Sequence, residues 1–114
     1  MKILIVEDEA ITSLDLKYSL EELGYDIIGT VDTGHDAIKV SCEKTPDVVL
    51  MDIKLKGEME GTQAAQEISK LNIPVIFLTA NTDEDTFKKI EKTYGFISKP
   101  FDLNELDETI KRFE

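Results

Sequence analysis

Five short apolar runs, each followed by a segment with helical periodicity, constrain the fold of this chain more than any other feature. The runs lie near residues 2–7, 26–31, 47–52, 74–78 and 95–98, and the helical segments near 9–23, 34–44, 61–71, 83–93 and 102–113. Apolar runs rich in β-branched residues are typical of strands buried on both faces. Their alternation with helices predicts an α/β fold, a doubly wound parallel sheet of five strands.

Local signals support two of the predicted helix starts. Thr33 is followed three residues later by Asp36, and Asp102 is followed in the same way by Glu105. A hydroxyl or carboxylate at such a position can accept a hydrogen bond from a free N–H group of the first helical turn. We therefore expect helices to begin directly after Thr33 and Asp102.

The composition narrows the choice of partners and compartment. The 114 residues suit one domain, and 41% of them are hydrophobic, enough for a core. A net charge of −11 makes nucleic acid an unsuitable direct partner. The single cysteine, Cys42, allows no internal disulfide, and no apolar run reaches the length of a membrane span. We expect a cytoplasmic protein without membrane insertion, with Cys42 as a small buried side chain.

Three carboxylates follow two of the predicted strands. Glu7 and Asp8 close the first run, and Asp52 closes the third. In a sheet of order 2-1-3-4-5 these two strands are neighbours, and ligands of doubly wound sheets bind beyond the carboxyl ends of the strands. Converging carboxylates repel one another, and a divalent cation relieves the repulsion. All-oxygen ligands favour Mg²⁺, Mn²⁺ or Ca²⁺, so the sequence predicts a metal site.

Further polar residues end the fourth and fifth predicted strands, at the same edge. Thr79 and Ala80 follow the fourth run, and Lys99 follows the fifth. Taken singly, these residues have simpler interpretations: Asp8 could cap a helix, Asp52 could form a turn, and Lys99 could be a solvated surface charge. Their convergence on one edge favours a functional site.

The ordered set resembles the receiver domain of two-component response regulators, over essentially the whole chain. The pieces that carry the resemblance are Glu7-Asp8, Asp52, Thr79-Ala80 and Lys99-Pro100-Phe101. The resemblance implies a flavodoxin-like (βα)5 fold with strand order 2-1-3-4-5. It also implies a single receiver domain over residues 1–114, without an output domain.

The resemblance implies a role for each residue of the edge. Asp52 would take a phosphoryl group from the phosphohistidine of a histidine kinase or histidine phosphotransfer protein. Asp8, Asp52 and the backbone carbonyl of Lys54 would hold Mg²⁺ (or Mn²⁺), with Glu7 acting through water. Lys99 would supply a second positive charge to the transferring group.

The resemblance also implies a switch. The Thr79 hydroxyl and the Ala80 N–H would bind the phosphoryl oxygens, and closure of the Thr79 loop would let Phe96 swing inward. The alternative for Phe96 is a static core residue. The surface that changes, for an unknown downstream protein, would comprise residues 83–93, 95–98 and 102–113. The chain would be a monomer or a phosphorylation-dependent dimer.

The sequence departs from the common receiver pattern in two loops. Gly61 follows Asp52 by nine positions, one more than is common, and the segment between Thr79 and Lys99 is shorter by about two residues. Lys54 and Asn81 stand at positions that tune the lifetime of phosphoaspartate in the family. Lys54 would either pair with the phosphoryl group and exclude water or point into solvent.

The first predicted helix carries two apolar stripes. Besides a stripe directed at the sheet, Ile11, Leu14 and Tyr18 recur at a different helical angle. We expect them to pack against the helix at 102–113. The alternative is a docking surface for the helices of a kinase or phosphotransfer partner.

Other functions on the same topology fit the residues less well. A phosphatase of the haloacid dehalogenase type also uses an aspartyl nucleophile, but it has an Asp-x-Asp pattern, whereas Asp52 is followed by Ile53 and Lys54. A flavodoxin-like nucleotide binder needs N–H donors after its first strand, and Glu7-Asp8-Glu9 would repel a phosphate there. The alternative is that the chain is a receiver fragment of a hybrid sensor kinase or larger regulator.

Overall fold

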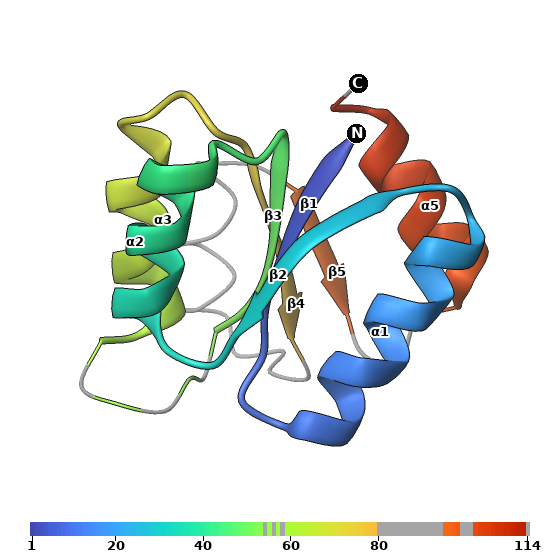
Figure 1. Ribbon diagram of the computed structural model, residues 1–114, viewed down its shortest axis with the longest axis horizontal. Coiled ribbons are helices and arrows are strands. Elements are labelled where there is room, and N and C mark those ends of the chain that lie inside the picture. Colours follow the sequence, from blue (N-terminus) through green and yellow to red (C-terminus); the bar gives the residue numbers. More distant parts are fainter. Residues whose placement is uncertain (54, 56, 58, 80–94, 99–101, 114) are drawn as a thin grey trace.

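A parallel five-stranded sheet organises the molecule. The computed structural model describes residues 1–53, 55, 57, 59–79, 95–98 and 102–113. Within these ranges (Figure 1) the elements are β1 (Lys2–Val6), α1 (Ala10–Glu22), β2 (Asp26–Val31), α2 (Gly34–Lys44), β3 (Val48–Asp52), α3 (Gly61–Ser69), β4 (Val75–Thr79), β5 (Gly95–Ser98) and α5 (Leu103–Lys111). All neighbouring strands pair in parallel, in the order β2-β1-β3-β4-β5, which confirms the predicted sheet. The predicted helix at 83–93 lies outside the described residues.

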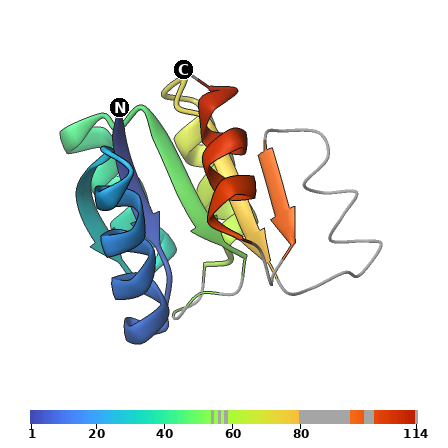
Figure 2. The same cartoon turned by 90° about the vertical axis from the view of Figure 1, so that its right-hand side faces the viewer.

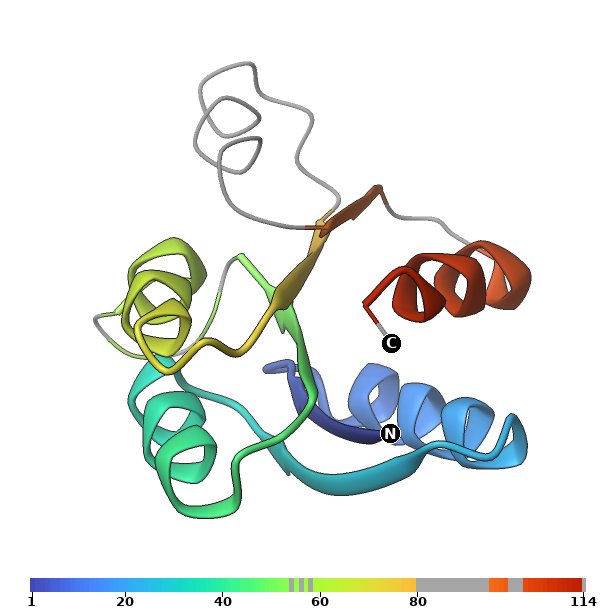
Figure 3. The same cartoon turned by 90° about the horizontal axis from the view of Figure 1, so that it is seen from above.

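Helices cover both faces of the sheet. Figure 2 looks onto the face of the sheet that α1 and α5 cover. Figure 3, the view from above, shows α2 and α3 on one side of the sheet and α1 and α5 on the other. Successive side chains of a strand point to opposite faces. Ile3 and Ile5 of β1 therefore join the core beneath α1 and α5, while Leu4 and Val6 join the core beneath α2 and α3. None of the described helices combines the length and the apolar character that a membrane crossing requires.

Side-chain caps begin two of the helices. The Thr33 hydroxyl accepts a hydrogen bond from the Asp36 N–H at 3.1 Å, and the Asp102 carboxylate accepts one from the Glu105 N–H at 2.7 Å. Both predicted helix starts are confirmed. Each cap satisfies a backbone donor that the helix leaves free, and is worth about 1 kcal/mol.

Two expectations about helix surfaces are wrong. Cys42 is exposed, because α2 turns Ala37 and Ser41 toward the core and Cys42 lies one position beyond that buried line. The second stripe of α1 is also exposed: 86% of Ile11, 48% of Leu14 and 58% of Tyr18 are accessible to solvent. This stripe therefore does not form the predicted packing against α5.

A polar bridge links the α1 side of the molecule to α5. Tyr25, in the turn between α1 and β2, is 9% exposed, and its hydroxyl donates a hydrogen bond to the Asp107 carboxylate on α5. Lys111, one helical turn further along α5, lies 3.2 Å from the same carboxylate. The Tyr25 hydroxyl and the Lys111 ammonium hold the pKa of Asp107 below its ordinary value of 3.8.

Candidate metal centre

The pairing of two central strands brings three carboxylates to one edge of the sheet. Val6 of β1 is paired with Met51 of β3, so Glu7 and Asp52 each lie one residue beyond that pair. The Glu7 N–H donates a hydrogen bond to the Val31 carbonyl at 2.9 Å, which extends the contact between β1 and β2 past the end of β1. The parallel register places the carboxyl ends together, as the sequence predicts.

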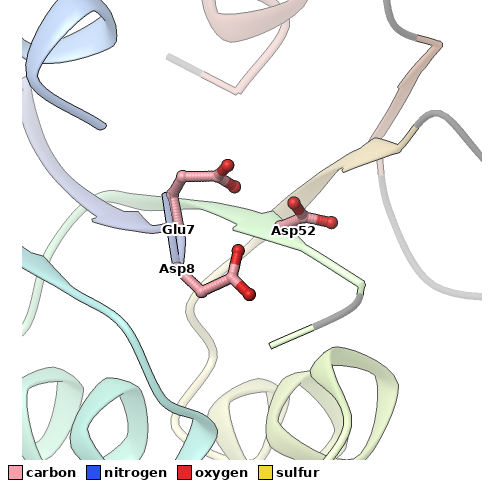
Figure 4. Close-up of side chains that lie close together, drawn as sticks. All are labelled: Glu7, Asp8 and Asp52. Atoms are coloured by element: carbon pink, nitrogen blue, oxygen red, sulfur yellow. The ribbon is translucent and has the colours of Figure 1, made fainter. Parts of the chain in front are cut away.

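The three carboxylates form a compact cluster. Glu7, Asp8 and Asp52 each offer an oxygen that lies within 4.8 Å of the oxygens of the other two (Figure 4). Glu7 is only 4% exposed, whereas Asp8 and Asp52 are half-buried. The cluster thus has one buried member and two members that solvent reaches.

This donor set suits a hard divalent cation. Three carboxylates at this separation repel one another, and a positive ion between them would offset that repulsion. The carboxylate oxygens all lie within 4.8 Å of one another, close enough for one small cation to be held by some of them directly and by another through water. Because Asp8 and Asp52 are half-buried, water can complete the coordination, as Mg²⁺ prefers. The residues present therefore fit Mg²⁺ or Mn²⁺.

A cleft of about 450 Å³ opens beside the cluster. It is lined by Glu7 and Asp8, by the first turns of α1, and by Asp32 and Asp36 after β2, with Lys17 as its basic residue. The acidic lining attracts cations toward the cluster. Neither Asp32 nor Asp36 was predicted to line this site: Asp36 was expected only at a helix start, although Asp32 directly follows β2 and so lies at the same edge as Glu7.

The structure places two further predicted residues and leaves the others open. Thr79 is the last residue of β4 and pairs with Ser98 of β5, one position beyond the pairing of Asp52 with Leu78. Phe96 lies in β5, is half-buried and packs against the core beneath α2 and α3. The described residues do not include the remaining predicted residues, which are Lys54, Ala80, Asn81, Lys99, Pro100 and Phe101.

Comparisons with known proteins agree with this geometry. The family described as the response regulator receiver domain matches residues 3–111. The transcriptional regulatory protein PdtaR of Mycobacterium tuberculosis is 34% identical over 108 residues, which cover 92% of this chain and 52% of PdtaR. The chain thus spans about half the length of that relative.

Two solved structures extend the likeness to three dimensions. The signal receiver domain of a modulated diguanylate cyclase from Desulfovibrio desulfuricans superposes with a TM-score of 0.90 at 33% identity, covering 97% of this chain and 90% of that one. The receiver domain of the sensor histidine kinase PA1611 from Pseudomonas aeruginosa, described with a magnesium ion in its active site cleft, has a TM-score of 0.87 at 29% identity. It covers 98% of this chain, and 95% of that domain is covered in turn. From its sequence, its sheet and its acidic edge, this chain belongs to the response regulator receiver domain family.

Proposed function

We propose that this receiver domain is a phosphoacceptor of a two-component phosphorelay and that Asp52 is the residue phosphorylated. The observation that carries the proposal is the cluster of Glu7, Asp8 and Asp52 at the carboxyl edge of the sheet. Asp52 ends the central strand, between the acidic pair of β1 and the end of β4 at Thr79. It is half-buried, so a donor can reach it from solvent.

The proposed reaction is a transfer between two nucleophiles. A carboxylate oxygen of Asp52 forms a bond to the phosphorus of a phosphohistidine, and the bond from phosphorus to nitrogen breaks. The electron pair of that bond returns to the imidazole of the donor, and Asp52 becomes an acyl phosphate. The domain would in this way catalyse its own phosphorylation and the slow hydrolysis of its acyl phosphate, without acting as a multiple-turnover enzyme.

Positive charge near Asp52 is central to this chemistry. Asp8 and Asp52 would bind Mg²⁺ (or Mn²⁺) directly, the Lys54 carbonyl would be a third ligand, and the buried Glu7 would act through water. The bound ion would neutralise charge on the transferring group. Lys99 would supply the second positive charge, a role that rests on the family resemblance.

The read-out of phosphorylation would pass through the edge of the sheet. The Thr79 hydroxyl and the Ala80 N–H would bind the phosphoryl oxygens, and Phe96 would then rearrange in β5. Phe96 already packs against a core cluster, so a change in its side-chain position would alter the packing beneath α3. Lys54 and Asn81 would set how fast water hydrolyses the acyl phosphate.

The exposed stripe of α1 is the proposed contact for the phosphodonor. Ile11, Leu14 and Tyr18 form an apolar surface, and Leu14 also lines the cleft beside the acidic cluster. A helical partner carrying the phosphohistidine could bury this stripe and bring its imidazole to Asp52. Because PdtaR is about twice as long, the domain could also act within a longer regulator or hybrid kinase.

The test is the intact mass of the protein after incubation with acetyl phosphate, with and without Mg²⁺. The native chain should gain one phosphoryl group only with Mg²⁺, and Asp52→Asn should gain none. Asp32→Asn is the matched control, because it removes an acid from the neighbouring cleft but not from the cluster. An adduct that persists in Asp52→Asn would contradict the assignment.

A further inference from the structure

The first residue of α3 lies against the backbone that carries Asp52. The Gly61 N–H donates a hydrogen bond to the Ile53 carbonyl at 2.9 Å, which closes the loop after β3 into a ring. A Cβ atom at Gly61 would lie 2.4 Å from the Asp52 carbonyl oxygen and 2.9 Å from the Ile53 Cα. Both neighbours are backbone atoms, so no side-chain rotation could relieve the contact.

Gly61 is needed for space and not for its backbone conformation. Among the described glycines, only Gly24 and Gly57 have the left-handed φ that disfavours other residues. An alanine at position 61 could therefore adopt the local backbone, yet it would have to displace the peptide between Asp52 and Ile53. This distinguishes Gly61 from a glycine that merely permits a turn.

The described residues around that peptide give it little freedom to move. Ile53 is 7% exposed, and Leu55 and Met59 pack against the core beneath α2 and α3. Asp52 is held from the other side by its pairing with Leu78 of β4. A Cβ at position 61 would therefore push on the backbone segment that carries the Asp52 carboxylate.

We propose that Gly61 is a positioning residue for Asp52: its N–H and its bare Cα clamp the Asp52–Ile53 peptide so that the carboxylate meets Glu7 and Asp8. The inference rests on the proposed phosphoacceptor function. Functional groups must be held within about 0.5 Å of their productive geometry, and relieving a 2.4 Å contact needs a shift of that order. The clamp therefore couples the start of α3 to the metal centre.

The experiment compares Gly61→Ala with two controls. Gly29→Ala adds the same atom in β2, where it would meet Leu4 Cδ1 at an ordinary 3.4 Å. Ile68→Val loosens the packing of α3, where Ile68 is fully buried, without touching the loop. Each protein is checked for folding by circular dichroism, titrated calorimetrically with Mn²⁺, and incubated with acetyl phosphate and Mg²⁺ for intact mass.

We expect Gly61→Ala to bind Mn²⁺ at least ten-fold more weakly than the native chain and to form the phosphoryl adduct at least ten-fold more slowly. Both controls should stay within about two-fold of the native chain in each measurement. The proposal is overturned if Gly61→Ala folds and keeps its Mn²⁺ affinity and its rate of adduct formation within two-fold of the native chain. It is also overturned if Ile68→Val loses as much affinity and rate as Gly61→Ala. The native chain and Asp52→Asn are measured first, so failure of the phosphoacceptor function itself would be visible separately.

A second variant covers the case in which Gly61→Ala does not fold. Replacing the Gly61 N–H by an ester oxygen, in a chain assembled by ligation at Cys42, removes the hydrogen bond to Ile53 and adds no atom. We expect this chain to fold and to bind Mn²⁺ several-fold more weakly. Native Mn²⁺ affinity in the ester chain would overturn the clamp.

Discussion

The two helical layers of this receiver domain are built differently. On one face of the sheet, α2 and α3 are in direct contact: Gly34 begins α2 so close to α3 that an added Cβ would lie 3.2 Å from the Cβ of Ala64. On the other face, the α1 side is tied to α5 by the hydroxyl of Tyr25 on the Asp107 carboxylate. The helices of one layer pack directly against each other, whereas in the other layer a polar bridge is added to the apolar core that α1 and α5 share.

This difference bears on which surface can serve a partner. The small residues of the α2–α3 layer let the helices approach one another. In the α1–α5 layer, α1 keeps Ile11, Leu14 and Tyr18 on its outer side. The layer with the bridge therefore retains an apolar surface next to the acidic cleft, whereas the packed layer uses its small residues internally. Four experiments on substituted chains test this difference between the layers, and they are given in order of their expected effect on stability.

The largest effect is expected from truncating the core of either layer. Leu106→Ala beneath α5 and Ile68→Ala beneath α3 each remove a fully buried side chain, and each should lower the free energy of unfolding by about 2–5 kcal/mol. Urea denaturation followed by circular dichroism measures both. A loss confined to one of the two would show that the layers do not share a cooperative unit.

A smaller loss is expected where α2 meets α3. In Gly34→Val the new side chain would meet Met59 Cγ and Sδ at 3.0 Å as well as Ala64, so overpacking should cost about 1–3 kcal/mol. The Met59 side chain can yield in part, which keeps the cost below that of a core truncation. Gly29→Val in β2 is the control, because it makes the same replacement at a glycine whose added Cβ would have an ordinary contact with Leu4. If the midpoint of urea denaturation were the same for Gly34→Val as for the native chain, α2 and α3 would not be in tight contact.

The polar bridge should contribute a pH-dependent stability. Because Tyr25 and then Lys111 lower the pKa of Asp107, the unfolded chain binds more protons than the folded chain between the lowered pKa and 3.8. The contribution is thus fully present above pH 3.8 and is lost as the pH falls through the lowered pKa. Tyr25→Phe should be less stable than the native chain at neutral pH, and the difference should shrink in acid. Thermal unfolding across this range measures it, with the exposed Tyr18→Phe as control.

The smallest effect on stability is expected at the exposed stripe of α1. Leu14 is 48% exposed, so Leu14→Asp should change the free energy of unfolding by no more than about 0.5 kcal/mol. Transfer from a histidine kinase or phosphotransfer protein should nevertheless slow, while phosphorylation by acetyl phosphate should change much less. Unfolding of the variant would instead mean that Leu14 is needed for packing.

Much of the fold could be predicted because it follows from periodicity and topology. The five strands and the placement of Glu7, Asp8 and Asp52 at one edge required only the alternation of apolar runs and helices. The burial of Cys42 was predicted wrongly, since a step of one residue along a helix turns a side chain by about 100°. Contacts between distant segments carried no such signal: Tyr25 and Asp107 are 82 residues apart.

The candidate site also has a part that could be predicted from the sequence and a part that could not. The convergence of the carboxylates on a common edge could be predicted, because parallel strands end together. The contact of Gly61 with the Asp52 peptide could not be predicted, because it depends on how the chain returns from β3 to α3. The nine-residue spacing drew attention to the loop without indicating what closes it.

The exposed thiol has a practical consequence for handling the molecule. Since α2 starts after the carboxyl end of β2 and runs back antiparallel to the strands, Cys42 in its last turns lies toward the opposite edge from Glu7, Asp8 and Asp52. It is the only cysteine of the chain, so a maleimide would react at one place. Molecules tethered to a sensor chip through Cys42 would all be oriented with their acidic edge facing the flowing solution.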